Sequence, residues 1–265
     1  MRLPLLLVAA SPAAAEDALD LLWPSPLLNF YDLLAQRQNA ALKKLIMRVA
    51  RNSSGVSKTN IGGWQSDANF FERTEAPVAV LRIRAYHAIF RYLQAMAPRG
   101  TEGTYEVSIG SAWANVNNRS HSNSPHMHPG VQLSGVYYVD DGGDRDGGLR
   151  LIDPRPQASM VPVPARWTRG MGEHVRVAAL PGLFVIFPAW LQHYTAAHTA
   201  GRPRLSIAFN VRLTFPDDGE VNCFVAGSAA SGAPPTEVAR LTFTVPVYAE
   251  TSRPGLRPIR PPARP

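Results

Sequence analysis

Apolar residues in the first hundred positions recur at the three- and four-residue spacing of a helix. Residues 31–51 (YDLLAQRQNAALKKLIMRVAR) predict one amphipathic helix that ends before Asn52. Its apolar stripe is Leu34, Ala41, Leu45 and Val49. Residues 77–97 predict a second helix, which stops at a Pro-Arg-Gly sequence. Its stripe is Leu81, Ala85, Ala88, Ile89, Tyr92 and Leu93. The glycine-rich residues 59–71 between the helices predict a shaped loop.

From residue 104 onward the pattern changes to short runs of β-branched and aromatic residues separated by Gly, Pro and Asp. Six such runs predict strands, at residues 105–117, 132–139, 147–154, 174–180, 182–189 and 204–215. No helical period separates them, so we expect an antiparallel sandwich or barrel. A further strand is predicted within residues 239–250. The fold class is therefore mainly β with N-terminal helices (α+β).

Composition favours one domain with extensions at both ends. The chain has 265 residues, of which 45% are hydrophobic, enough for a substantial core. We expect a helical region over residues 16–101 and a β core with its C-terminal extension over residues 102–250. The proline- and arginine-rich residues 251–265 should be disordered or polyproline-like. This tail supplies four of the +7 net charges, so the basicity does not indicate nucleic-acid binding.

The first residues, MRLPLLLVAASPAAAED, have the basic start, apolar stretch and small residues of a secretory signal, which would cover residues 1–15. An overextended start in an alanine-rich chain would look the same. We expect a secreted or organellar protein in the first case and a cytoplasmic one in the second. No later segment has about 20 uninterrupted apolar residues, so no membrane span is expected.

Histidine clusters in residues 121–139, HSNSPHMHPGVQLSGVYYV. His126 and His128 alternate, so on an extended chain both would face the same side and could bind one ion, with His193 as a distant third ligand. Cys223 is the only cysteine, which excludes a thiolate cluster within the chain. Two imidazoles and a carboxylate on one face are the ligands of a mononuclear Fe(II) site that activates oxygen.

Six segments in sequence order resemble the 2-oxoglutarate- and Fe(II)-dependent oxygenases, most closely a bacterial and phage-type subgroup with an HxHP…SGvYYv…DPR signature. They are NIGGWQS (60–66), SAWANV (111–116), HMHPGVQLSGVYYV (126–139), GGLRLIDPR (147–155), LPGLFVIFPAWLQH (180–193) and RLSIAFN (204–210). A looser similarity to prolyl-hydroxylase-type enzymes covers only the β core. The resemblance implies a double-stranded β-helix (jelly-roll) core over about residues 102–216.

The resemblance also implies roles for individual residues. His126 and His193 would bind iron, and Arg204 would pair with the 5-carboxylate of 2-oxoglutarate. Arg202 lies at a similar spacing from His193, but Arg204 opens the RLSIAFN strand, and its planar guanidinium suits a carboxylate. Tyr138 would donate its hydroxyl to the same carboxylate.

His128 stands where the wider family has Asp. Either the site uses three histidines, or His128 lies outside the ligand set and a carboxylate such as Asp153 reaches the metal. An all-imidazole site would also suit zinc, copper or nickel. Asp153-Pro154-Arg155 otherwise predicts a strand-ending turn, which is our preferred interpretation.

Other candidates have plainer interpretations. Asn115 lies on the same strand face as Trp113 and could contact the co-substrate, while Trp113 itself is predicted to be a core residue. Trp64 could equally be a pocket wall or a packing residue. The remaining histidines are predicted to be structural (His121, His174, His198) or at a surface or interface (His87).

The resemblance implies a dioxygenase that uses Fe(II), 2-oxoglutarate and O2 to hydroxylate an unactivated C–H bond, releasing succinate and CO2. The substrate would be a peptide or small molecule, selected by residues 60–66 and 155–174. The alternatives are a cupin-like metal dioxygenase that does not use 2-oxoglutarate and a non-catalytic jelly-roll binding protein. The sequence predicts no nucleic-acid partner and leaves the oligomeric state open.

Overall fold

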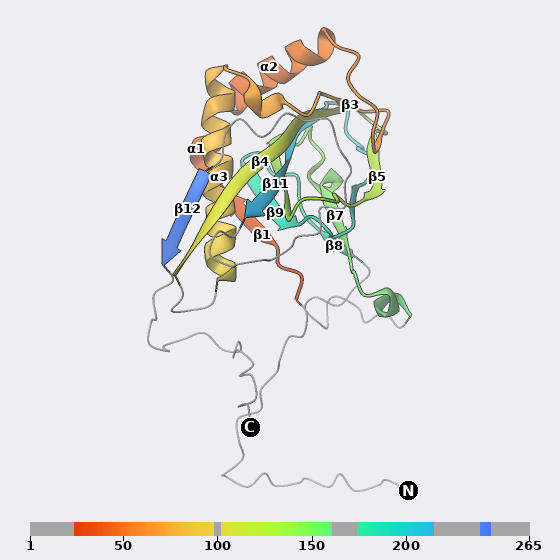
Figure 1. The fold of residues 1–265 in the computed structure, drawn as a ribbon. Coiled ribbons are helices and arrows are strands. Elements are labelled where there is room, and N and C mark those ends of the chain that lie inside the picture. The colour runs from red at the N-terminus through yellow and green to blue at the C-terminus, as the bar shows by residue number, and fades with distance from the viewer. Residues whose placement is uncertain (1–23, 98–101, 161–173, 215–238, 245–265) are drawn as a thin grey trace, which may run out of the picture. The chain divides into compact units, whose positions relative to one another are not determined.

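A computed structural model of the chain describes residues 24–97, 102–160, 174–214 and 239–244 (Figure 1). The predicted signal sequence, the C-terminal tail and residues 161–173 of the predicted selectivity insert lie outside these ranges. The described residues from Ser25 onward belong to one compact unit. None of their helices is long and apolar enough to cross a membrane.

Two antiparallel sheets form the jelly-roll core. The first sheet has the order β1-β9-β6-β11-β4-β12, and β3 pairs with β4 beside it. Its strands are β1 (Leu28–Tyr31), β3 (Trp64–Gln65), β4 (Glu102–Asn117), β6 (Leu133–Asp140), β9 (Leu183–Pro188), β11 (Arg204–Thr214) and β12 (Ala239–Thr244). The second sheet has the order β2-β5-β10-β7-β8. Its strands are β2 (Asn60–Ile61), β5 (Ser122–His126), β7 (Leu149–Ile152), β8 (His174–Arg176) and β10 (His193–Thr195).

The chain passes back and forth between the sheets, which is how a double-stranded β-helix is built. From β4 onward it visits the first sheet, the second, the first, the second twice, the first, the second and then the first twice. All six predicted strand runs are confirmed, and the late strand is found as β12. The expectation of a shaped loop without regular elements over residues 59–71 was wrong, because β2, β3 and a short 3-10 helix (Phe70–Glu72) lie there.

The helices cover the first sheet on one face (Figure 1). They are α1 (Leu33–Gln36), α2 (Asn39–Arg51) and α3 (Ala76–Met96). Two further 3-10 helices, which are not part of this layer, span Arg145–Gly147 (η2) and Pro156–Ser159 (η3). The predicted helix over residues 77–97 is confirmed as α3, and all six residues of its predicted stripe are buried. This agreement follows from an uninterrupted helical phase over 21 residues.

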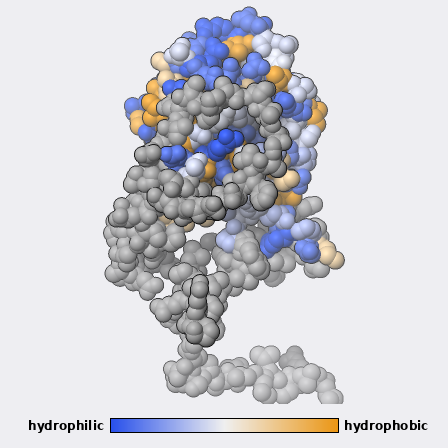
Figure 2. Space-filling model, in the orientation of Figure 1, coloured by the Kyte–Doolittle hydropathy of each residue, from blue (hydrophilic) through white to orange (hydrophobic). Residues whose placement is uncertain are grey.

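The single helix predicted over residues 31–51 is wrong. Tyr31 ends β1, and Asp32 caps the one-turn helix α1 by accepting hydrogen bonds from two backbone N–H groups. A turn then separates α1 from α2, so an apolar stripe counted across the break is out of phase. Leu34 and Ala41 are exposed, and the buried residues of α2 are Leu42, Leu45 and Ile46. In Figure 2 the surface of the described part is hydrophilic over much of its upper region, where Figure 1 places α2.

The two faces of the first sheet have different surroundings. Adjacent residues of β6 show this difference, because successive side chains on a strand point to opposite faces. The Tyr137 hydroxyl donates to Oδ1 of Asn39 on α2 at 2.6 Å, whereas the Tyr138 hydroxyl accepts from the backbone N–H of Leu149 on β7 at 3.0 Å. The helix-covered face carries the main apolar core, and the opposite face is left to form a site between the sheets.

Candidate metal and co-substrate site

Strand pairing brings three histidines together. His126 is the last residue of β5, His193 is the first residue of β10, and the two are direct partners in the antiparallel register. His128 follows two residues after the end of β5, and its Nε2 lies 3.3 Å from Nε2 of His193. One ring nitrogen from each of the three lies within 4.8 Å of the others. The three candidate ligands therefore converge on one point.

Backbone carbonyls orient two of these rings. Nδ1 of His126 is 2.7 Å from the carbonyl oxygen of Ser124, and Nδ1 of His193 is 2.9 Å from that of Leu191. A carbonyl oxygen can only accept, so Nδ1 carries the proton in both rings and Nε2 keeps a free lone pair. This is the arrangement by which proteins fix the tautomer of a metal-binding histidine.

Burial keeps the three imidazoles neutral. It lowers the pKa of His126, and it lowers the pKa of His193 to about 4 despite the opposing effect of the hydrogen bond to Leu191. Burial and the neighbouring His193 and His126 lower the pKa of His128 to about 3. Neutral imidazole is the form that binds a metal ion, so the site is ready for one near pH 7.

Asp153 does not join this group. Its Oδ1 accepts from the backbone N–H of Arg155 at 3.0 Å, and its Oδ2 lies 2.6 Å from Nη2 of the same arginine. These contacts form the strand-ending turn that the sequence predicts. Among the described residues, the converging donors are imidazoles only, a set that fits Fe(II) and is also compatible with zinc, copper and nickel.

A cavity of about 290 Å³ adjoins the histidines and takes residues from both sheets. It is lined by the candidate ligands, by Arg204, Tyr138 and Asn115, and by residues that sequence reasoning did not single out. The latter include Gln65, Asn117, Ser206, Thr59, Asn123 and Thr195. Their signal is present in β4, where Trp113, Asn115 and Asn117 alternate on one face, but their partners on the other strands cannot be identified without the register.

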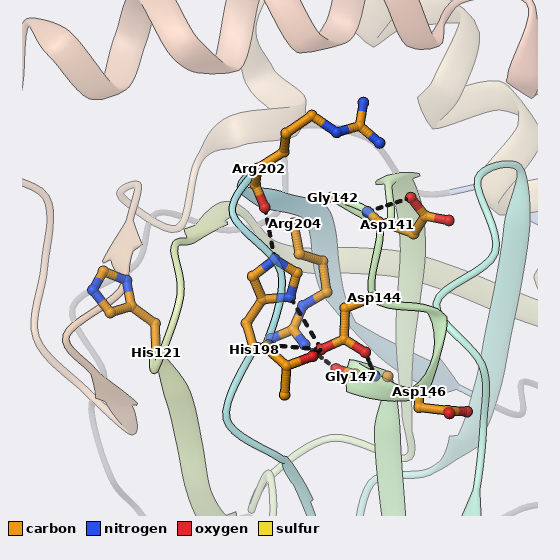
Figure 3. Close-up of polar contacts among 12 residues, drawn as sticks. His121, Asp141, Gly142, Asp144, Asp146, Gly147, His198, Arg202 and Arg204 are labelled. Carbon is orange, nitrogen blue, oxygen red and sulfur yellow. Dashed lines mark hydrogen bonds and ion pairs between the residues drawn. The ribbon is translucent and has the colours of Figure 1, made fainter.

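Arg204 is the first residue of β11 and is only 2% exposed. Its Nη1 donates to the backbone carbonyl of Gly147. Burial lowers its pKa, but an arginine remains charged in a protein. Arg202, the alternative at similar spacing, has an exposed side chain that does not line the cavity, and in Figure 3 its guanidinium points away from that of Arg204.

Tyr138 and Asn115 lie in one row across the first sheet. Ser206 on β11 is the register partner of both, and Gln65 on β3 is the next partner beyond Asn115. Burial raises the pKa of Tyr138, so its hydroxyl keeps a proton. Since its oxygen accepts from Leu149, the proton is free to be donated to an anion in the cavity.

Of the two tryptophans, Trp113 differs from expectation, and Trp64 takes one of the two roles expected for it. Trp113, predicted as a core residue, lines the cavity, and its ring centroid is 5.7 Å from that of His128. It shares the strand face of Asn115, which is the cavity face. Trp64 packs against the main apolar core and donates from Nε1 to the Ser53 carbonyl at 3.1 Å, so it has the packing role.

The remaining histidines do not line the cavity. Nδ1 of His121 accepts from the backbone N–H of Asn118, His174 lies beside Arg176, and His198 is buried against the Arg202 carbonyl. His87 is half-buried in α3, with its ring edge against Phe30, rather than at the surface. Gln65 is the one residue of the predicted selectivity loop 60–66 that lines the cavity. Thr59 and Ala68, on either side of the loop, line it as well.

Comparison with known proteins agrees with this geometry. Residues 111–210 match a family model described as "Putative 2OG-Fe(II) oxygenase". The chain is similar in fold to SnoN, a non-haem α-ketoglutarate-dependent epimerase from nogalamycin biosynthesis, with a TM-score of 0.52 and 17% identity over 87% of this chain and 95% of that one. It is also similar to SnoK, an α-ketoglutarate-dependent carbocyclase from the same biosynthesis, with a TM-score of 0.51 and 13% identity over 72% and 82% of the two chains.

No curated protein matches the chain. The matched residues 111–210 contain all three histidines, Tyr138 and Arg204, so the family match includes these lining residues of the cavity. Fe(II), 2-oxoglutarate and O2 are the cofactor and co-substrates of this class of enzyme. Residues 111–210 are therefore similar to the 2-oxoglutarate- and Fe(II)-dependent oxygenases in sequence, and the chain is similar to enzymes of this class in fold.

Proposed function

We propose that the protein is a 2-oxoglutarate- and Fe(II)-dependent oxygenase that hydroxylates an unactivated C–H bond of a small molecule or peptide. His126, His128 and His193 would bind the metal, and Arg204 with Tyr138 would bind the distal carboxylate of 2-oxoglutarate. Asn115, beside them on β4, would add a polar contact to the co-substrate. The observation that carries the proposal is that three neutral imidazoles and a buried arginine line one cavity.

The overall reaction would convert 2-oxoglutarate, O2 and a substrate C–H group into succinate, CO2 and a C–OH group, with the bound metal supplying the oxidising chemistry. The protein's contribution is binding and orientation. Arg204 can hold a carboxylate by two parallel hydrogen bonds, and Tyr138 can donate a third. The cavity contains no aspartate or glutamate among its described lining residues, so no negatively charged side chain there would repel an anionic co-substrate.

The walls of the cavity favour a polar substrate portion of modest size. Gln65 and Asn115 are register partners on β3 and β4, and both amides lie on the cavity face. Near them, Thr195 Oγ1 donates to Asn123 Oδ1 at 3.0 Å, and Asn123 Nδ2 donates to Thr59 Oγ1 at 3.3 Å. The ring of Trp113 supplies apolar surface next to the histidines.

The experiment is a measurement of succinate formed from 2-oxoglutarate with Fe(II) and O2, with and without peptide and metabolite pools. We expect Fe(II)-dependent succinate formation that a productive pool stimulates. The His193→Ala variant should lose it, whereas His174→Ala, a matched change outside the cavity, should keep it. Turnover of a pool without succinate formation would instead indicate a cupin-like dioxygenase, and a protein that binds no Fe(II) would indicate a non-catalytic jelly roll.

A further inference from the structure

A buried acid and a buried imidazole lie behind Arg204, outside the residues that line the cavity (Figure 3). Asp144 precedes η2, and its side chain is 8% exposed. Its Oδ1 accepts from the backbone N–H of Gly147 at 2.9 Å, while its Oδ2 accepts from the backbone N–H and the hydroxyl of Thr199, both at 2.8 Å. Three hydrogen bonds therefore fix this carboxylate, one from the nearby Gly147 and two from Thr199, which is distant in the sequence.

His198 connects the same carboxylate to the start of β11. Its side chain is fully buried, and its Nε2 donates to the Arg202 carbonyl at 2.7 Å. Its Nδ1 lies 3.5 Å from Oδ2 of Asp144, an ion pair when the imidazole is protonated, and makes no hydrogen bond to the described residues. Replacing Gly142 by a larger residue would disturb this arrangement, since a Cβ there would lie 2.8 Å from Nε2 of His198 and 2.5 Å from the Arg202 carbonyl oxygen.

These contacts close a ring around the arginine. The Gly147 N–H is bound by Asp144, and the Gly147 carbonyl accepts from the Arg204 guanidinium. Arg204 follows two residues after Arg202, whose carbonyl is bound by His198. Asp144 and His198 thus lie between the Gly147 segment, which binds the guanidinium, and the backbone just before the strand of Arg204. Figure 3 shows these residues grouped together.

The spacing in this ring leaves no room for a larger residue at its centre. A Cβ at Gly147 would lie 2.7 Å from Oδ2 of Asp144 and 2.9 Å from Nη1 of Arg204. The carboxylate and the guanidinium are therefore held on either side of a glycine. In the absence of an anionic ligand, Asp144 also provides a negative charge near a buried cation, which lowers the cost of keeping that cation buried.

We propose that Asp144 and His198 are positioning residues that hold the Arg204 guanidinium ready for the distal carboxylate of 2-oxoglutarate. An arginine side chain has many rotamers, so fixing it before the ligand arrives lowers the entropy lost on binding and improves affinity. The inference rests on the proposed role of Arg204. It adds that the selectivity for a dicarboxylate depends on residues that never touch the co-substrate.

The test compares two 2-oxo acids that differ only at the distal end. Dissociation constants for 2-oxoglutarate and for 2-oxobutyrate, which lacks the distal carboxylate, are measured by anaerobic titration calorimetry on the Fe(II)-loaded protein. The variants are Asp144→Asn, His198→Phe and Gly147→Ala, and melting temperatures are recorded in parallel. Asp141→Asn is the matched control, because it makes the same charge change on a neighbouring residue whose side chain contacts Gly143 and Arg145 instead.

We expect each of the three variants to bind 2-oxoglutarate about tenfold more weakly, the equivalent of one weakened hydrogen bond to a charged group, with 2-oxobutyrate unaffected. Asp141→Asn should behave as the wild type. Equal weakening of both acids, or an unchanged preference in all folded variants, would overturn the inference. If Asp144→Asn does not fold, His198→Phe decides by the same ratio. A wild-type protein that does not distinguish the two acids would instead overturn the proposed role of Arg204 itself.

Discussion

The most informative single substitution at the proposed co-substrate site is Arg204→Met. It removes the buried positive charge and keeps an unbranched side chain of similar volume. Arg204 is 2% exposed, so a carboxylate that reaches it has left bulk water. A hydrogen bond between charged groups is stronger in this low-dielectric interior than in water. Arg202→Met is the matched control, because that side chain is exposed and does not line the cavity.

The expected loss follows from the number of contacts that a guanidinium can make. A hydrogen bond to a charged group contributes about 1.5–3 kcal/mol, and a bidentate pair makes two of them. Desolvation of the co-substrate's carboxylate offsets part of the gain, so we use the low end, about 3 kcal/mol for the pair. Each 1.4 kcal/mol corresponds to a factor of about ten, so Arg204→Met should weaken 2-oxoglutarate binding on the order of 100-fold.

The assay is the dissociation constant of 2-oxoglutarate on the Fe(II)-loaded protein, with the KM for succinate formation as a second readout. Fe(II) affinity should not change, because Arg204 is not among the converging histidines. Affinity for 2-oxoglutarate in Arg204→Met equal to that of the wild type would refute the reasoning. An equal loss in Arg202→Met would show that net charge, rather than this one position, is responsible.

Three further predictions concern the surroundings of the site. Gly135→Ala should lower the free energy of unfolding by about 1–3 kcal/mol in urea titrations, because the new methyl group would lie 2.3 Å from the buried ring of Phe209; unchanged stability would contradict the packing of β6 on β11. Asp32→Ala should lower the free energy of unfolding by about 3 kcal/mol in the same titrations, since it removes a helix cap and leaves Arg84, 2.6 Å from that carboxylate, without this partner. A decrease under about 1 kcal/mol would show that the pair behaves as a solvent-exposed one. Trp113→Phe should remove most of the quenching of tryptophan fluorescence by Co(II), since the ring adjoins the metal site; persistent quenching would place the metal elsewhere.

The parts of the fold that the sequence predicted are those whose burial is continuous. The strands found in five of the six runs are mostly buried, and α3 buries one face, so their apolar periodicity is visible; β8 is the exception, with no buried residue. The strands β5 (SNSPH) and β10 (HYT) were missed as strands because their side chains line a polar cavity and carry no apolar alternation. The elements that hold the histidines are therefore the least visible as secondary structure.

The site was predictable to the extent that its residues are marked by spacing. His126, His128, His193 and Arg204 were identified from their positions in recognisable segments, and the structure places all four around one cavity. Trp113 was misassigned because an aromatic residue in a strand can face either side until the register is known. No local pattern links the segments around residues 144 and 198, so the network behind Arg204 was not predicted.

Anaerobic titration with Fe(II) tests the central claim, that three histidines bind one metal ion, most directly. Wild-type protein should bind one equivalent, and single alanine variants of His126, His128 and His193 should each lose saturable binding at concentrations that saturate the wild type. His121→Ala, a change in the same segment but outside the cluster, should bind as the wild type does. His128→Ala with wild-type affinity and stoichiometry would contradict the three-histidine site.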